Sequence, residues 1–193
     1  MPENEKRTRR ALEAALWELL KRKPLDRLRV REVTELCGLR RQSFYYHFKD
    51  VYDLFDWSIQ RERALLLARQ EDCLTWRQAL GDLLERIACQ RAFYQAVLRE
   101  RGRPGLRELL PLSGMLEKAL AYYRSRCGLS LDAATEQTQL QSWETVLLSL
   151  LESWTGGELE LEPGALLDQM ERSVEQSAAG AAWQSLRSRN MNA

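Results

Sequence analysis

The sequence predicts an all-α protein, and two observations carry that prediction. Apolar residues recur at helical spacings of three and four residues, and no stretch alternates between apolar and polar residues for the length of a strand. Prolines and glycines separate these stretches at Pro24, Gly38, Gly102-Arg103-Pro104-Gly105, Gly128, Gly156-Gly157 and Pro163-Gly164. Because 45% of the 193 residues are hydrophobic, the chain can bury a core, which excludes disorder as its main state.

The first helix is expected over residues 5–21. Apolar residues at relative spacings of 3, 4, 7 and 8 form its buried face: Leu12, Ala15, Leu16, Leu19 and Leu20. Lys21, Arg22 and Lys23 follow at the C-terminal end, where positive charge complements the helix dipole, and Pro24 ends the helix.

Two short helices and one long helix come next. The second helix is expected over residues 30–37, and Gly38 is its expected left-handed C′ residue. Only Leu39 separates it from a third helix over residues 40–46, which places Phe44 inward. Asp50 is the expected N-cap of a fourth helix that continues to about Gln70. Residues 1–50 are therefore predicted as a three-helix domain joined to the rest by a long helix.

The sequence after the fourth helix predicts a helical bundle. Helices are expected over residues 76–99, 106–126 (disturbed by Pro111), 131–153 and 164–189. We therefore expect a second domain over residues 51–193.

Charge is segregated along the chain although its formal net charge is only +1. Residues 1–50 hold 13 Lys and Arg against 8 Asp and Glu, whereas residues 51–193 hold 16 against 20. From Leu36 to Lys49 there is no acidic residue. A local positive surface of this kind is typical of a site that contacts phosphates.

A tight glycine-containing turn between two short helices is the helix-turn-helix arrangement, which presents its second helix to the DNA major groove. With Phe44 inward, Arg41, Gln42, Tyr45 and Tyr46 point outward, flanked by Ser43 and His47. Arg pairs with guanine and Gln with adenine, and hydroxyl groups reach phosphates or base edges. The N-terminal cations offer backbone contacts, a minor-groove arm or simply a solvated surface: Lys6, Arg7, Arg9 and Arg10.

The run from Leu28 to Phe48 resembles the DNA-binding domain of the TetR family of transcriptional regulators. Signature positions of that family are occupied by Gly38, Phe44, Tyr45, His47 and Phe48, with Lys49-Asp50 and Asp53-Leu54 following. The resemblance implies a DNA-binding surface made of Arg29, Arg40, Arg41, Gln42, Ser43, Tyr45, Tyr46, His47 and Lys49.

The sequence also departs from the family pattern. Arg29 and Arg40 stand where the family usually has a Ser or Thr N-cap, which predicts a loss of about 1 kcal/mol for each cap, partly offset by positive charge toward DNA. Val51 replaces a frequent lysine and removes one expected phosphate contact. These departures predict weaker or differently oriented binding.

Further similarity points to the branch of the family that includes the activator of dihydroxyacetone kinase operons. It is carried by residues 41–48 and 50–54, by Arg91-Ala92-Phe93-Tyr94 with Leu98, and by residues 150–157 leading to Glu162-Pro163.

The resemblance implies an effector pocket in the second domain and dimerisation through its last two helices. The pocket candidates are aromatic residues near the middles of helices, for which core packing is the alternative: Trp57, Phe93, Tyr94, Tyr122 and Trp143. A single short recognition helix reads few base pairs, so we expect a homodimer on a palindromic operator. The candidate interface comprises Leu140, Trp143, Leu147, Leu150, Leu151, Leu167, Met170, Val174 and Trp183.

Several classes of protein are excluded by what the sequence lacks. His47 is the one histidine, and neither GxGxxG nor GxxxxGK[ST] occurs, so we expect no enzyme, no nucleotide cofactor and no metal site. The cysteines are scattered and expected to be reduced and mostly buried: Cys37, Cys73, Cys89 and Cys127. The longest apolar run, Ala64 to Ala68, is too short for a membrane span, and no secretory signal is evident, so a cytoplasmic protein is expected.

Together these observations predict a ligand-responsive, sequence-specific DNA-binding transcriptional regulator. Repression is the default expectation because most members of the family repress. Effector binding would shift the helix from Asp50 to about Gln70 and change the spacing of the two recognition helices. The alternative is a ligand-sensing co-regulator that acts through a protein partner.

Overall fold

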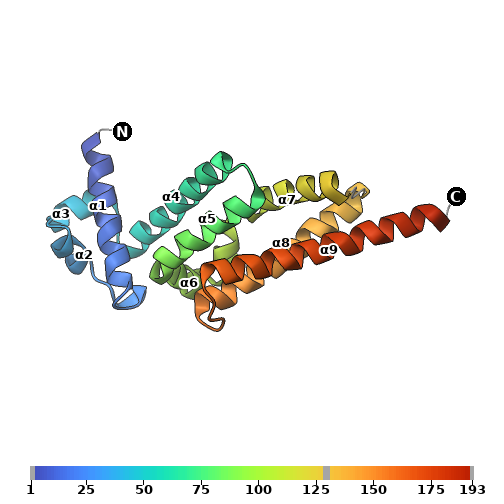
Figure 1. Ribbon diagram of the computed structural model, residues 1–193. Coiled ribbons are helices and arrows are strands. Elements are labelled where there is room, and N and C mark those ends of the chain that lie inside the picture. The colour runs from blue at the N-terminus through green and yellow to red at the C-terminus, as the bar shows by residue number, and fades with distance from the viewer. Residues whose placement is uncertain (1–2, 128–130, 192–193) are drawn as a thin grey trace. The chain divides into compact units, whose positions relative to one another are not determined.

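The computed structural model describes residues 3–127 and 131–191, and their side chains apart from those of Cys127 and residues 183–191. The described part is helical and contains no strand (Figure 1). Its elements are α1 (Glu3–Leu20), the short 3-10 helix η1 (Leu25–Arg27), α2 (Val30–Leu36), α3 (Arg41–His47), α4 (Val51–Asp72), α5 (Trp76–Cys89), α6 (Arg91–Leu109), α7 (Leu112–Cys127), α8 (Ala133–Gly156) and α9 (Pro163–Met191). The all-α prediction is confirmed.

The chain forms two compact units, and each is built from two separate segments. Unit 1 consists of Met1–Leu65 and Gln90–Leu109, and unit 2 of Leu66–Cys89 and Leu110–Ala193. Helix α4 belongs to both units because it runs without interruption from Val51 to Asp72. A functional division after residue 50 stays a prediction.

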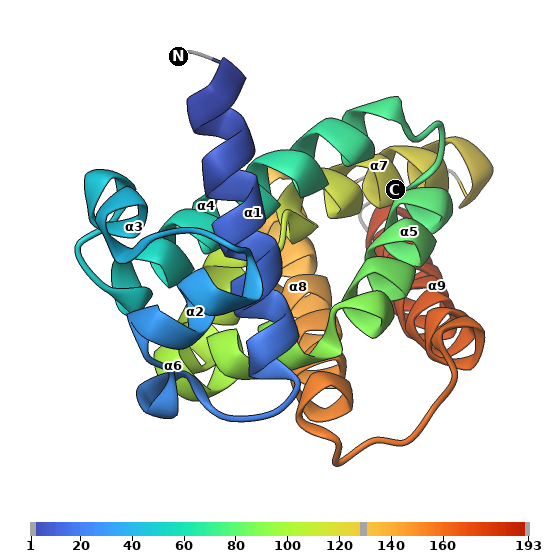
Figure 2. The ribbon, with the colours of Figure 1, turned by 90° about the vertical axis from the view of Figure 1, so that its left-hand side faces the viewer.

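The core of unit 1 joins the first helices to α6. α1 packs on α2 and α6, and α2 packs on α3 (Figure 2). The Trp17 ring stacks on Phe93 with centroids 4.8 Å apart, and Phe55 meets Phe93 edge to face at 5.7 Å. Aromatic pairs of this geometry stabilise a core beyond the area that they bury. The C-terminal part of α1 is therefore covered by a segment far away in the sequence.

Two polar contacts inside unit 1 involve nearly or fully buried carboxylates of α1 and α4. The buried Glu13 pairs with Arg61, which joins α1 to α4. The hydroxyl of Tyr94 donates to Oε1 of Glu62 at 2.8 Å, and both residues are fully buried. Buried polar groups are costly unless they have partners, so these contacts fix how α1, α4 and α6 meet.

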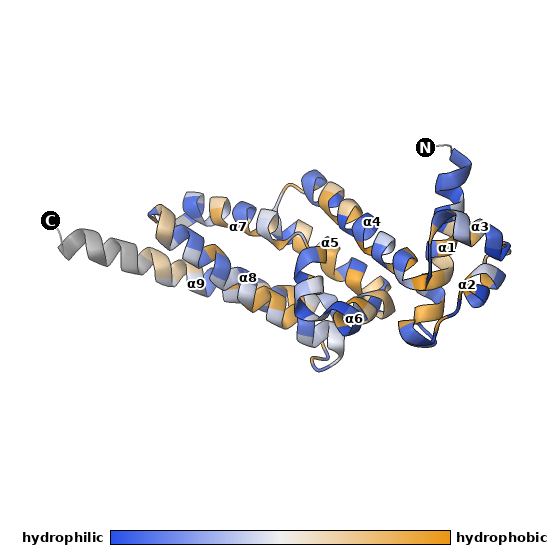
Figure 3. Cartoon of the chain, turned by 180° about the vertical axis from the view of Figure 1, so that it is seen from behind, coloured by the Kyte–Doolittle hydropathy of each residue, from blue (hydrophilic) through white to orange (hydrophobic). Residues whose placement is uncertain are grey.

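Unit 2 is a bundle of α5, α7, α8 and α9. α5 packs on α7 and α9, and α8 packs on the same two helices. Polar and apolar residues alternate along these helices (Figure 3). The buried side chains include Leu80, Leu83, Leu84, Ile87, Leu116, Ala119, Trp143, Leu147, Leu151, Leu166, Met170 and Val174.

The helix boundaries of the middle region differ from the expected ones. The expected helix over residues 76–99 ends at Cys89, and α6 begins at Arg91 with the Gln90 carbonyl accepting from the amides of Phe93 and Tyr94. No glycine or proline marks this break, which is where the chain passes from unit 2 to unit 1. The expected break near Gly102 is present as a sharp kink, because Gly102 has the non-helical angles φ 62° and ψ −165°, and α6 denotes the helical segments on both sides of it. Pro111 does separate two helices, as expected.

Two smaller features complete the fold. The cysteines within the described side chains are free, and Cys73 is buried whereas Cys89 is exposed, so the expectation of mostly buried thiols holds only in part. The described helices include none long and apolar enough to cross a membrane.

Candidate nucleic-acid interface

The turn between α2 and α3 has the geometry that the sequence predicts. Gly38 adopts φ 67°, a left-handed conformation that favours glycine. The amide of Gly38 donates to the Glu35 carbonyl at 3.3 Å and that of Leu39 to the Thr34 carbonyl at 2.9 Å. These two bonds form a Schellman motif, which closes α2 and turns the chain sharply into α3.

Helix α3 is held by one apolar face and exposes the rest. Phe44 is fully buried and lies 5.9 Å from the ring of Phe48, which is also buried. Tyr45 and Tyr46 follow Phe44 directly, and their side chains are 58% and 74% exposed. Both tyrosines therefore present much of their surface outside the unit.

All nine residues of the predicted DNA-binding surface lie in unit 1. Seven are exposed and two, Ser43 and His47, are half-buried. The exposed ones are Arg29, Arg40, Arg41, Gln42, Tyr45, Tyr46 and Lys49. The structure brings the members on α3 together opposite Phe44, while Arg29 precedes α2 and Lys49 precedes α4. Their DNA-binding role stays a prediction.

The ends of α2 and α3 show what replaces the missing Ser or Thr caps. Neither Arg29 nor Arg40 caps its helix with a side chain. At α2, however, Oε2 of Glu32 accepts from the Arg29 amide at 3.0 Å, which satisfies one donor near the helix start. Lys23 pairs with the same carboxylate at 2.5 Å. Both hydrogen bonds lower the pKa of Glu32, and the bond from Lys23 has the larger effect. The expected absence of a side-chain cap is therefore confirmed at both helices, and at α2 Glu32 satisfies a different donor, the amide of Arg29.

The start of α4 is fixed by two aspartates. Oδ1 of Asp50 accepts from the Asp53 amide at 2.9 Å, which confirms Asp50 as the N-cap. Oδ2 of Asp53 accepts from the Lys49 amide, also at 2.9 Å. This reciprocal arrangement fixes the backbone of Lys49 at the point where α3 leads into α4.

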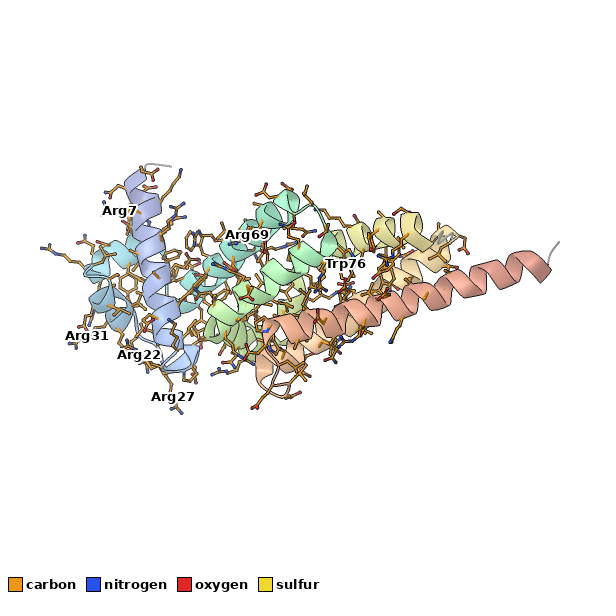
Figure 4. The ribbon with its side chains drawn as sticks, viewed as in Figure 1. Arg7, Arg22, Arg27, Arg31, Arg69 and Trp76 are labelled. Atoms are coloured by element: carbon orange, nitrogen blue, oxygen red, sulfur yellow. The ribbon has the colours of Figure 1, made fainter. Side chains whose placement is uncertain are left out.

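The N-terminal cations lie on a helix and not on an extended arm. α1 begins at Glu3, so Lys6, Arg7, Arg9 and Arg10 are helical. The Arg9 guanidinium lies over the rings of Phe48 and Trp57, at 5.7 and 6.0 Å from their centroids. Arg7 and three other labelled arginines point away from unit 1: Arg22, Arg27 and Arg31 (Figure 4). The structure thus favours backbone contacts or a solvated surface over a minor-groove arm formed by these four residues.

A groove of about 640 Å³ separates the start of α1 from α3. Asn4, Glu5 and Thr8 line it on the α1 side, and Tyr46 and His47 on the α3 side. The Tyr46 hydroxyl donates to Oε1 of Glu5 at 3.3 Å. Partial burial lowers the pKa of His47, and the positive charge of Arg9 lowers it further. The negative charge of Glu5 raises the same pKa, by a smaller amount. Sequence patterns gave no indication of Glu5, because its partner lies 41 residues away.

The five predicted effector-binding residues divide between the two units. Phe93 and Tyr94 are buried in unit 1, where Trp57 is half-buried. In unit 2, Trp143 is buried with its ring 6.2 Å from Tyr123, whereas Tyr122 is 40% exposed. Phe93 in particular is committed to core contacts with Trp17 and Phe55, and the effector role of all five stays a prediction.

A cavity of about 450 Å³ in unit 1 lies at a different place from these five residues. Asp56 of α4 and Arg101 of α6 line it and form an ion pair of 2.5 Å, with Glu108 nearby. Nothing in the sequence pattern brings α4 and the kinked end of α6 together, so this cavity was not expected.

The predicted dimer interface is largely occupied inside unit 2. Leu147, Leu151, Met170, Val174 and Trp143 are buried within the unit itself, because they pack α8 and α9 onto its other helices. Half-buried members are Leu140, Leu150 and Leu167, and the side chain of Trp183 lies outside the described residues. The outward face of α8 is instead polar around Val146, with Gln141, Ser142, Thr145 and Ser149 exposed.

Comparison of the sequence with known proteins finds limited similarity. No family model matches the chain. The HTH-type dhaKLM operon transcriptional activator DhaS of Lactococcus lactis subsp. lactis (strain IL1403) is 24% identical over 90 residues, which are 47% of this chain and 48% of that protein. The match therefore spans about half the length of this relative.

Solved structures are similar over nearly the whole chain. The dihydroxyacetone kinase operon activator DhaS has a TM-score of 0.75 at 15% identity, covering 89% of this chain and 96% of that one. A tetR-family transcriptional regulator from Streptomyces coelicolor has a TM-score of 0.69 at 16% identity, covering 95% and 85%. The fatty acid degradation regulator FadR from Bacillus halodurans has a TM-score of 0.58 at 15% identity, covering 86% and 94%. The chain resembles TetR-family regulators and has their all-helical fold.

Proposed function

We propose that this protein is a sequence-specific DNA-binding transcriptional regulator whose helix α3 enters the major groove. The observation that carries the proposal is the exposed surface of α3, which combines Arg40, Arg41, Gln42 and Tyr45 and lies in a stretch without any acidic residue from Leu36 to Lys49. A short helix with such a surface, set after a tight glycine turn, suits groove reading. The fold shared with regulators supports the proposal.

The side chains divide into those that read bases and those that hold the backbone. Arg41 is suited to bidentate bonds with guanine O6 and N7, and Gln42 to bonds with adenine N6 and N7. Lys49, whose backbone Asp53 fixes, is suited to a phosphate. In this proposal α3 supplies specificity and the residues at the starts of α2 and α4 supply register.

The protein acts as a homodimer in this proposal, with α8 and α9 meeting their counterparts through outward faces. One copy of a seven-residue helix reads too few base pairs for specificity, whereas a twofold dimer reads both halves of a palindrome. Val146 lies on the outward face of α8, 44% exposed among small polar residues. Val146→Glu should therefore convert the dimer to a monomer in light scattering after gel filtration. Leu74→Glu, at a 92% exposed loop position, is the matched control.

The proposal further includes a response to a small-molecule effector and a sign of regulation, which is either repression or activation. Repression stays the default prediction from the sequence, while the DhaS proteins named above are called activators. A reporter gene placed behind the selected operator distinguishes the two signs, since expression falls with a repressor and rises with an activator. The absence of catalysis and a cytoplasmic location likewise remain predictions.

The first experiment selects bound sequences from a random DNA pool with purified protein at about 0.15 M salt. Enrichment of a palindrome supports a dimeric sequence-specific regulator. No enrichment by a folded dimer overturns the proposal and favours a co-regulator that works through a protein partner.

Variants then locate the reading surface. Arg41→Ala should weaken operator binding about tenfold to a hundredfold and relax the base preference at one position. Lys49→Ala should weaken binding to all sequences alike and reduce the salt slope by about one. Arg69→Ala, an exposed change on the last turn of α4, serves as the control of equal charge. Full operator affinity in Arg41→Ala would contradict the placement of the reading face.

A further inference from the structure

We propose that Glu5 determines which hydrogen bonds Tyr46 makes with DNA, so that Tyr46 acts as an acceptor and selects a base with a major-groove amino group. Such bases are cytosine, through N4, and adenine, through N6. This inference rests on the proposed function, and it adds a specificity-determining contact between α1 and α3.

The geometry that carries the inference is the contact across the groove between these helices. Tyr46 lies in the last turn of α3 and is the most exposed of its aromatic side chains, at 74%. Its hydroxyl donates to Oε1 of Glu5, in the first turn of α1, at 3.3 Å. The tyrosine is thus both exposed toward a partner and engaged by a carboxylate of the same unit.

A phenol hydroxyl has one proton to donate and lone pairs that accept, whereas an ionised carboxylate only accepts. While the Tyr46 hydroxyl donates its hydrogen bond to Glu5, the Tyr46 oxygen can only accept further hydrogen bonds through its lone pairs. Phosphate oxygens, guanine O6 and N7 and thymine O4 are all acceptors, so none of them can bond to that oxygen. The amino groups of cytosine and adenine are donors and can.

Charge favours the same outcome. The Glu5 carboxylate borders the groove that Tyr46 and His47 also line, and its charge is close enough to His47 to oppose the lowering of the His47 pKa. A negative charge in this place repels phosphates, which directs Tyr46 away from the DNA backbone and toward base edges. Arg40 and Arg41 lie at the opposite end of the same short helix and retain the phosphate and guanine contacts.

The test compares motifs selected from a random DNA pool by the full-length wild type and four variants. Wild type should prefer cytosine or adenine at one position of each half-site by about threefold to tenfold, the effect of a single hydrogen bond. Tyr46→Phe should remove the preference at that position alone. Glu5→Ala frees the hydroxyl proton, so the preference should move to guanine, thymine or no base at the same position. The double variant should behave as Tyr46→Phe does.

The matched control is Glu3→Ala, which removes the same charge from the same helix end at a residue paired with Lys6 instead of Tyr46. It should leave the motif unchanged. A Glu5→Ala motif identical to that of the wild type overturns the inference, and so does an equal change in Glu3→Ala, which would indicate general electrostatics. Failure of the wild type itself to select any motif is a different result, because it overturns the proposed function. Thermal unfolding of each variant verifies that the fold is retained.

Discussion

Nζ of Lys118 donates a hydrogen bond of 2.8 Å to the carbonyl oxygen of Gln70, so a side chain of α7 caps the last turn of α4. The same ammonium donates to the Cys73 carbonyl at 2.9 Å. Helices end with carbonyl groups that lack partners within the helix, and a cation there also complements the helix dipole. Lys118 thus fixes the end of α4 to α7 inside unit 2.

Replacing Lys118 tests this cap. Lys118→Met retains the apolar stem and removes the ammonium, and it should lower the free energy of unfolding by about 1.5–3 kcal/mol, the range for bonds that involve a charged group. Urea denaturation at fixed protein concentration measures the change. An unchanged denaturation midpoint would show that water caps the helix equally well.

Gly114 is the second test of the same joint. A β-carbon at Gly114 would collide with the Gln70 amide, which is buried against α7. With its nitrogen directed to the Pro111 carbonyl at 3.0 Å, this amide also accepts from the Met115 amide at 2.9 Å, so it has little freedom to move. Gly114→Ala should therefore destabilise the protein by about 1–3 kcal/mol, as overpacking does.

A double-variant cycle separates this collision from helix propensity. In a Gln70→Ala background the collision is gone, so Gly114→Ala should become neutral or stabilising by up to about 1 kcal/mol. Gly164→Ala, with open space around its β-carbon, controls for the general effect of replacing a helical glycine. Equal effects of Gly114→Ala in both backgrounds would refute the collision.

The kink in α6 requires glycine at position 102. Its φ of 62° with ψ of −165° lies in a region that is open essentially to glycine alone. Gly102→Ala should lower the free energy of unfolding by about 1–3 kcal/mol, with straightening of α6 as the way in which the strain is relieved. Denaturation reports the loss, and Gly105→Ala is unsuitable as a control because its β-carbon would meet Arg101. Unchanged stability would mean that α6 tolerates another path.

His47 gives the unfolding free energy a pH dependence of defined sign. Partial burial and then the charge of Arg9 lower its pKa from 6.5, so the unfolded chain binds this proton more readily than the folded chain. The stabilising contribution is therefore complete above pH 6.5 and is lost as the pH falls through the folded pKa. Comparing urea midpoints near pH 5 and pH 8, we expect the wild type to lose more stability than His47→Gln. Parallel losses in both proteins would contradict this assignment.

The first helices were the most predictable part of the fold because their signals are local. Gly38 needs a left-handed backbone and Asp50 caps the helix that it precedes, and both follow from residue type and spacing alone. The break at Gln90 has no such local signal, since it arises where the chain changes from one compact unit to the other. The interruption at Gly102, in contrast, follows from a local signal, because glycine permits the positive φ at which the helix changes direction.

In the candidate site, too, features with local sequence signals were predictable and features that depend on distant contacts were not. The outward set on α3 follows from helical periodicity once Phe44 is placed inward, and the exposed tyrosines confirm that arrangement. Glu5 could not be identified in this way, because its role depends on a contact across 41 residues. The leucines of α8 and α9 were assigned to a dimer interface because apolar periodicity does not distinguish a face that packs within one chain from a face that packs on a second copy.

The stacking of Trp17 on Phe93 limits how the recognition helices can be exchanged between proteins. A fragment that stops at residue 50, or even at residue 65, lacks the α6 segment that covers Trp17 and Phe55 and supplies the partner of Glu62. A chimaera made by swapping the N-terminal helices alone would expose these rings to water or set them against an unmatched surface. New DNA specificity is therefore obtained more safely by altering side chains on α3, or by transplanting residues 90–109 together with the N-terminal helices, than by a single crossover in the chain.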